Sequence, residues 1–235
     1  MTPELLILIG SAASVGLVHT VLGPDHYLPF VAMSRARGWT RRRTLWVTGV
    51  CGLGHVLGSV VLGVVGIAAG ITLRRLEVFE SVRGEVAGWL LMAFGLAYLA
   101  WSLVRLARNR PHLHAHQHAD GTAHAHSHDH HGDHVHAHTH RGGGLVPWSL
   151  FVIFVLGPCE PLIPLLMFPA ATLGAGAVVL VAVVFSVVTI ATMLILVAVS
   201  CLGLRVAWAE RSGRFSQPVA GALVFLCGVA IQLGL

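Results

Sequence analysis

The sequence predicts an all-α membrane protein with six transmembrane helices, arranged as a 3+3 inverted repeat. Three observations predict this fold. Only 11% of the 235 residues are charged, whereas an average soluble domain has about 25%. The chain contains six apolar runs of about the 20 residues that a bilayer core requires. The four residues Val-Leu-Gly-Pro occur at Val21 and again at Val155, an offset of 134 residues.

The predicted spans fall in two groups of three around a polar link. We expect the first repeat over residues 1–107, the link over 108–144 and the second repeat over 145–235. The six spans run over residues 5–28, 45–73, 86–106, 145–168, 173–204 and 217–235. Because each half has an odd number of spans, the second half enters the membrane from the opposite side. Such inverted repeats are common in transporters, which place their substrate site at the repeat interface.

The first and fourth spans each contain a helix-breaking dipeptide. The first span starts with MTPELLILIG, which lacks the basic region of a signal peptide, so we expect it to remain as a span. Proline lacks a backbone N–H and glycine adds backbone freedom. In a membrane, the freed backbone groups must meet protein or a water-filled cavity. The dipeptides Gly23-Pro24 and Gly157-Pro158 therefore predict two interrupted helices that face one cavity.

Ionisable residues surround the first break. His19, Asp25 and His26 lie in the first predicted span and His55 lies in the middle of the second. A buried Asp costs at least about 2.5–3.5 kcal/mol at bilayer depth, so such residues usually pair or serve a function. Imidazole is a good ligand for transition metals such as nickel, zinc and copper. These four residues predict a metal site, with structural polar residues or a metal-free proton relay as the alternatives.

Weaker candidates lie in the second half. The offset of 134 residues places Glu160 opposite His26 and places Cys159 opposite Asp25, so both are candidates for a metal ligand or proton carrier. The same offset takes His55 to Thr189, around which three hydroxyl residues recur on one helical face. These pore-lining candidates are Ser186, Thr189 and Thr192. Alternatively, they bond to their own helix or allow close packing.

The link holds thirteen of the sixteen histidines and almost no large apolar residues. Such a segment is expected to be disordered without metal, and histidine-rich tracts typically bind metal. The alternatives are a solvated spacer or a pH-dependent charge cluster. We expect the link to be an accessory metal collector. Its histidines are His112, His114, His116, His118, His124, His126, His128, His130, His131, His134, His136, His138 and His140.

Arginine predicts the orientation, because cytoplasmic loops carry an excess of basic residues. Twelve arginines lie in or beside the three links expected on one side: Arg35, Arg37, Arg41, Arg42, Arg43, Arg105, Arg108, Arg110, Arg141, Arg205, Arg211 and Arg214. Only Arg74, Arg75 and Arg83 belong to the other side. The link is therefore expected in the cytoplasm of a bacterium and both termini outside its plasma (inner) membrane. This bias also accounts for the net charge of +5 without a nucleic-acid partner.

HTVLGPDH in the first span and GLGHVLGSVV in the second resemble motifs of the nickel/cobalt transporter superfamily. The histidine-rich link resembles that of the six-span efflux proteins. GPCEPLIPLL resembles the matching motif of urease-accessory or sulfite-exporter-like members. The resemblance implies transport of Ni²⁺ or Co²⁺ as substrate, with His19, Asp25, His26 and His55 as ligands. It implies no enzymatic activity and no permanent cofactor. Possible partners are urease or hydrogenase maturation proteins.

The chain departs from the import branch of that superfamily in two ways. Five residues separate His19 from Asp25-His26 instead of four, and there are six predicted spans instead of eight. The direction of transport therefore stays open. With no nucleotide-binding motif, a proton gradient is the simplest energy source, because ligands must lose protons to bind metal.

Three other functions stay open. The first is a thiol–disulfide electron carrier, although the counterpart of Cys159 is Asp25 and not a second cysteine. The second is a sulfite or anion exporter, which would favour a cationic lining, yet no arginine is expected in the middle of a span. The third is a non-transporting protein that delivers metal to an enzyme.

Overall fold

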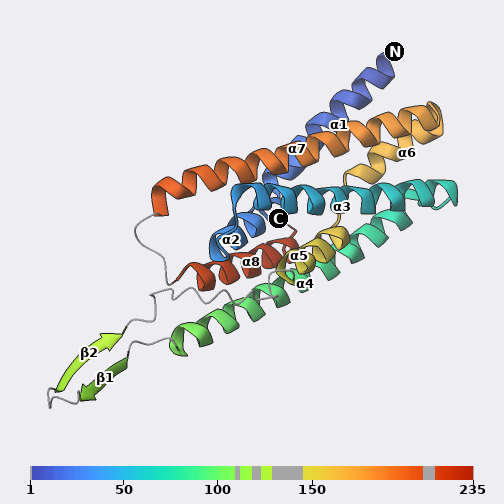
Figure 1. The fold of residues 1–235 in the computed structure, drawn as a ribbon. Helices are drawn as coiled ribbons and strands as arrows, with labels where there is room; N and C mark the ends of the chain where they lie inside the picture. Colours follow the sequence, from blue (N-terminus) through green and yellow to red (C-terminus); the bar gives the residue numbers. More distant parts are fainter. Residues whose placement is uncertain (1, 109–111, 118–122, 129–144, 209–214, 235) are drawn as a thin grey trace.

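The computed structural model describes residues 2–108, 112–117, 123–128, 145–208 and 215–234. Over these ranges the regular secondary structure is helical except for two short strands (Figure 1). In chain order the elements are α1 (Pro3–Leu22), the 3₁₀ turn η1 (Pro24–His26), α2 (Leu28–Ala36), α3 (Arg41–Ala68), α4 (Leu73–Arg108), β1 (His112–Gln117), β2 (Ala123–His128), α5 (Leu145–Leu156), α6 (Leu162–Thr172), α7 (Ala175–Trp208) and α8 (Ser216–Gln232). The predicted helical fold class is confirmed.

Four helices are long and apolar enough to cross a membrane: α1, α3, α4 and the Ala175–Leu202 part of α7. The two other predicted spans correspond to shorter helices, α5 with α6 and the 17-residue α8. Large apolar side chains cover the outside of the bundle, including Leu22 and Trp46, which are 72% and 69% exposed. Long apolar helices with an apolar exterior are compatible with a multi-pass membrane protein.

Helix α4 is longer than the sequence predicts. We expected the third span to begin at residue 86, after a charged segment, but the helix begins at Leu73. Glu80 and Arg83 lie inside it, one turn apart, and their side chains form an ion pair with an N–O distance of 2.6 Å. Because the two charges pair, this part of the helix can pack against its neighbours in spite of its polar sequence.

The two Gly-Pro dipeptides interrupt the helices as predicted. Helix α1 ends at Leu22, and a 3₁₀ turn separates it from α2. Helix α5 ends at Leu156, and α6 begins only at Leu162. Each helix thus stops one residue before the glycine, since the following proline supplies no N–H for a helical hydrogen bond.

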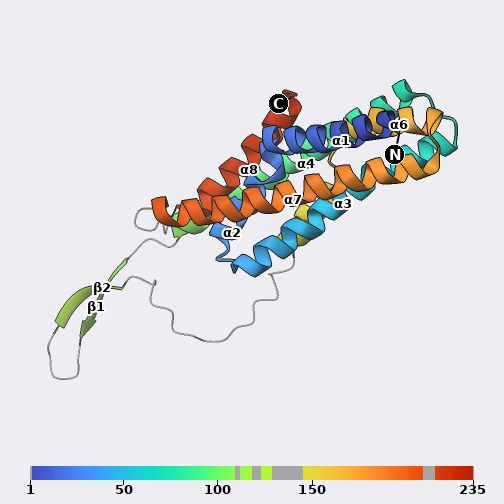
Figure 2. The same cartoon turned by 90° about the horizontal axis from the view of Figure 1, so that it is seen from above.

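The long helices pack side by side in an elongated bundle (Figures 1 and 2). Helix α7 lies along α1 and α3, α5 packs on α3, and α4 packs along α8, which also contacts α2. One buried cluster joins α2, α3, α4, α5, α7 and α8, and a second joins α1, α3, α6 and α7. The antiparallel pair β1–β2 lies beyond the end of α4 (Figure 1). The interrupted helices are thereby held against the uninterrupted ones at the level of the breaks.

Candidate metal site

Three histidines meet inside the bundle. His19 comes from the last turn of α1, His26 from the 3₁₀ turn after the first break, and His55 from the middle of α3. Each offers one ring nitrogen, and these atoms all lie within 4.8 Å of one another. The ring centroid of His26 lies 4.7 Å from that of His19 and 5.0 Å from that of His55. The sequence predicted these three residues, and the tertiary structure brings them together.

Hydrogen bonds assign the ring protons of two of the histidines. Nδ1 of His26 lies 3.2 Å from both Asp25 Oδ1 and the Gly23 carbonyl oxygen. Nδ1 of His55 lies 3.3 Å from the carbonyl oxygen of Phe154. Each of these partners accepts in this geometry, so each Nδ1 carries the proton and each Nε2 presents a lone pair. A carboxylate or carbonyl on the far nitrogen is the usual arrangement behind a metal-binding histidine.

The free nitrogens are enclosed. His26 and His55 are 3% and 2% exposed, and the Nε2 atom of each is buried with no hydrogen-bond partner in the described residues. A buried polar group without a partner costs about 1–3 kcal/mol. Two such atoms beside each other indicate a ligand site, because native structures rarely leave buried polar groups unsatisfied.

The glycine of each Gly-Pro dipeptide makes room for one of these imidazoles. A Cβ on Gly23 would lie 2.5 Å from Nδ1 of His26, and a Cβ on Gly157 would lie 3.1 Å from Nδ1 of His55. Any side chain at Gly23 would therefore displace the ring from its carboxylate. Besides interrupting its helix, each glycine lets the backbone approach the edge of a histidine.

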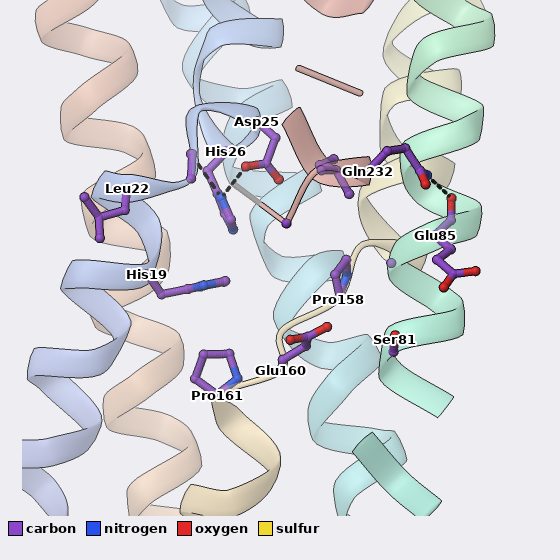
Figure 3. A pocket seen from close by; sticks show the side chains of 14 residues that line it. His19, Leu22, Asp25, His26, Ser81, Glu85, Pro158, Glu160, Pro161 and Gln232 are labelled. Atoms are coloured by element: carbon purple, nitrogen blue, oxygen red, sulfur yellow. Dashed lines mark hydrogen bonds and ion pairs between the residues drawn. The ribbon is translucent and has the colours of Figure 1, made fainter. Parts of the chain in front are cut away.

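A cavity of about 530 Å³ adjoins the site. His19, Asp25 and His26 line it on one side, and Pro158 and Glu160 of the second break line it on the other (Figure 3). The two interrupted helices thus face one cavity, as the sequence predicts. Glu160 also lines a second cavity on the side of Arg74 and Glu77. Glu160 is exposed and is not in the group of three histidines.

Sequence reasoning missed two residues, Glu80 and Arg83. Glu80 is fully buried, and its Oε2 accepts a 3.2 Å hydrogen bond from the backbone N–H of Cys159. Nη2 of Arg83 donates to the carbonyl oxygens of Val155, at 2.9 Å, and Gly157, at 3.3 Å. The pair therefore satisfies backbone groups that the second break leaves open.

The expectation that no arginine lies in the middle of a span stays a prediction, but Arg83 lies inside helix α4, which begins at Leu73 and not at residue 86. Arg83 precedes residue 86, at which the sequence predicts the third span to begin, so the sequence alone assigns it to a link. The spacing of an acidic and a basic residue three apart, within a segment of helical periodicity, was the available signal. The guanidinium of Arg83 is paired with the Glu80 carboxylate. Arg83 therefore does not supply the uncompensated positive charge that an anion site would favour.

The remaining candidates are distributed as follows. Asp25 lies against Nδ1 of His26, on the far side of the ring from Nε2. Ser186 donates to the Ala182 carbonyl of its own helix, at 2.6 Å. Thr189 and Thr192 are buried, and neither lines the cavity at the breaks. Their pore-lining role stays a prediction.

The histidine-rich link falls largely outside the described residues. His112, His114 and His116 belong to β1, and His124, His126 and His128 belong to β2. The other seven lie outside the described ranges: His118, His130, His131, His134, His136, His138 and His140. Metal collection by the link and its predicted disorder therefore stay predictions.

Comparisons with protein-family models, with curated proteins and with solved structures gave no match to this chain.

Asp25→Asn is expected to weaken metal binding about 10- to 100-fold, the range found when a partner behind a metal-binding histidine is replaced. Asparagine keeps the shape of the side chain but removes the charge that makes Nε2 of His26 more basic. Isothermal titration of the purified protein with Ni²⁺ measures the change. Glu4→Gln, which alters an exposed carboxylate in the first turn of α1, serves as the control. Equal affinities in the two variants would contradict an orienting or binding role for Asp25.

Proposed function

We propose that this protein carries a divalent transition-metal cation, nickel or cobalt, across a membrane by a secondary mechanism. The observation behind the proposal is the group of three histidines at the breaks, two of which present a buried Nε2 atom that has no partner among the described residues. Imidazole binds nickel, zinc and copper well, whereas Mg²⁺ and Ca²⁺ prefer oxygen ligands. A site built from nitrogen donors thus favours the transition metals.

The position of the site suits transport. Its histidines come from an interrupted helix and from a neighbouring continuous helix, so a relative movement of the two would change the ligand geometry. The adjoining cavity, of about 530 Å³, has room for a hydrated ion. Protons released when metal binds offer a means of coupling to a proton gradient.

We further propose that the chain crosses the membrane six times as two inverted repeats. In this arrangement α1 and α2 together form one interrupted span, α5 and α6 form its counterpart, and α8 is the last span. The exchange of packing partners supports it. Helix α1 packs on α7 while α5 packs on α3, and α2 packs on α8 while α6 packs on α4. Exchanging α1 with α5 and α3 with α7 converts the α1–α7 contact into the α5–α3 contact. Exchanging α2 with α6 and α4 with α8 converts the α2–α8 contact into the α6–α4 contact.

We further propose a bacterial inner membrane as the location, and the basic residues support an orientation with the link in the cytoplasm. Arginines occupy the start of α3, which is Arg41–Arg43, and the last turn of α4, which contains Arg105 and Arg108. These helix ends lie on the side of the bundle from which the β1–β2 pair projects (Figure 1). In this orientation the histidine-rich link would collect metal on the cytoplasmic side.

Flux of radioactive nickel in proteoliposomes with a defined pH gradient tests the proposal. We expect metal to cross faster than in protein-free vesicles, in proportion to the protein reconstituted, and to respond to the sign of the gradient. Mg²⁺ is the matched control ion and should not cross. A rate equal to that of protein-free vesicles would contradict transport and favour a metal-delivery role.

Deleting residues 113–139 is expected to reduce flux at low metal concentration but leave the rate at saturating metal nearly unchanged. The three histidines at the breaks lie in other elements, so the membrane site stays complete without the link. Flux measured over a range of nickel concentrations should show a raised KM. Replacement of the same residues by a glycine-serine linker of equal length controls for the connection itself. Complete loss of flux from both variants would show that the link is part of the transport path.

A further inference from the structure

Cys159 differs from the other described cysteines in its surroundings. It follows the second Gly-Pro dipeptide, and its side chain is fully buried. Its Sγ lies 3.9 Å from Nε2 of His19. Cys51 and Cys227 belong to the apolar cluster that joins α2, α3, α4, α5, α7 and α8, and Cys201 lies near the hydroxyl of Ser34. Of the described cysteines, Cys159 is therefore the one whose sulfur contacts a histidine of the site.

The separation of these two atoms matches a shared metal ion. With metal–nitrogen and metal–sulfur distances of about 2.0–2.1 and 2.3 Å, two ligands of one tetrahedral ion lie roughly 3.6 Å apart. The observed 3.9 Å is close to this value. The sulfur is not among the ligand atoms that the three histidines bring within 4.8 Å of one another, so its contact with the site in this structure is the one with His19. The Nε2 atoms of His26 and His55 have no partner in the described residues and point to a ligand beside that contact.

The main chain around Cys159 is held in place from outside the site. The Glu80 carboxylate accepts a hydrogen bond from the backbone N–H of Cys159, and Arg83 donates hydrogen bonds to the carbonyl oxygens of Val155 and Gly157. The same segment supplies the Phe154 carbonyl that bonds Nδ1 of His55. The segment of residues 154–159, which Glu80 and Arg83 hold in place, thus brings the sulfur to His19 and orients the imidazole of His55.

We propose that Cys159 is the fourth ligand of the metal site, which then holds its ion by three histidine nitrogens and one thiolate sulfur. The inference rests on the proposed function, of which it specifies the ligand set and the class of ion. Binding removes the thiol proton, which is released to solvent through the cavity that His19 lines, and the sulfur–metal bond forms in its place. Asp25 then orients His26 from behind instead of binding the ion. A thiolate shifts the preference further toward Ni²⁺, Co²⁺ and Zn²⁺ and away from Mn²⁺ and Mg²⁺.

Cobalt absorption of the purified full-length protein tests this ligand set. A Co²⁺ ion held by nitrogen and sulfur shows d–d bands in the visible range and a sulfur-to-cobalt charge-transfer band in the near ultraviolet. The histidine-rich link contains no cysteine, so the charge-transfer band does not report on it. We expect the band in the wild type and in the control variants Cys51→Ser and Cys227→Ser. We expect Cys159→Ser to lose it and to bind Co²⁺ at least about 10-fold more weakly.

His55→Ala is the second variant of the design. If the sulfur and the histidines bind one shared ion, the charge-transfer band is lost in this variant too. X-ray absorption of the nickel-loaded wild type gives an independent reading that needs no variant, with one sulfur expected at about 2.3 Å. Cobalt bands that depend on His26 and His55 but show no sulfur contribution would overturn the inference and leave the proposed function standing. If no cobalt absorption depends on these histidines, the inference and the proposed metal site both fail.

Discussion

His26→Ala and His55→Ala are each expected to abolish nickel flux in proteoliposomes while the protein remains folded in the membrane. Both side chains are almost completely buried, and each presents an Nε2 atom without a partner in the part of the chain that the structure describes. Removing one ring takes a ligand from an ion that has few protein donors, and no described neighbour replaces it. We expect nickel to bind at least about 100-fold more weakly, which is more than the loss caused by replacing a residue that only orients a metal-binding histidine.

The matched control for this prediction is Thr48→Val. Thr48 is buried in the same helix as His55, and its Oγ1 donates to the Thr44 carbonyl one turn earlier. The valine keeps the shape and should leave flux unchanged. Size-exclusion profiles in detergent show whether each variant is folded. If both histidine variants transport nickel at the wild-type rate, the residues are structural and the metal-site proposal fails.

Arg83→Met is expected to destabilise the protein by about 3–5 kcal/mol, the typical cost of removing one partner of a buried ion pair. The side chain of Glu80 is fully buried, and its Oε1 lies 2.6 Å from Nη1 of Arg83. Without the guanidinium, the carboxylate stays buried and uncompensated, and the carbonyl oxygens of Val155 and Gly157 lose their donor. The midpoint of thermal unfolding in detergent measures the loss.

The double variant Glu80→Gln with Arg83→Met separates charge from packing. It removes both charges, so it should recover most of the stability lost in the single variant, because replacing a whole buried pair costs far less than breaking it. Arg75→Met, at an exposed position of the same helix, is the control and should change stability by no more than about 0.5 kcal/mol. Equal unfolding midpoints for Arg83→Met and Arg75→Met would show that the pair does not hold the second break.

Local features of the sequence were sufficient to predict part of the molecule. Apolar composition and run length predicted helices suited to a membrane, because the bilayer sets these requirements residue by residue. The proline in each Gly-Pro dipeptide predicted where α1 and α5 would end, since its missing N–H acts within the same segment. The unusual depth of His19, His26 and His55 in apolar runs marked them as candidates for a site.

Only the tertiary structure decided how these parts combine. The proton on Nδ1 of His55 depends on the carbonyl of Phe154, which lies 99 residues further along the chain. Cys159 meets His19 across 140 residues, and periodicity within either segment carries no information about that contact. Glu80 and Arg83 pair with each other one turn apart in α4, but the backbone groups of the second break that they bond lie more than 70 residues further along the chain. The sequence by itself thus determined which residues lie in helices and where two of these helices break. Packing between distant segments decided which nitrogen atoms remain free and what holds the second break in place.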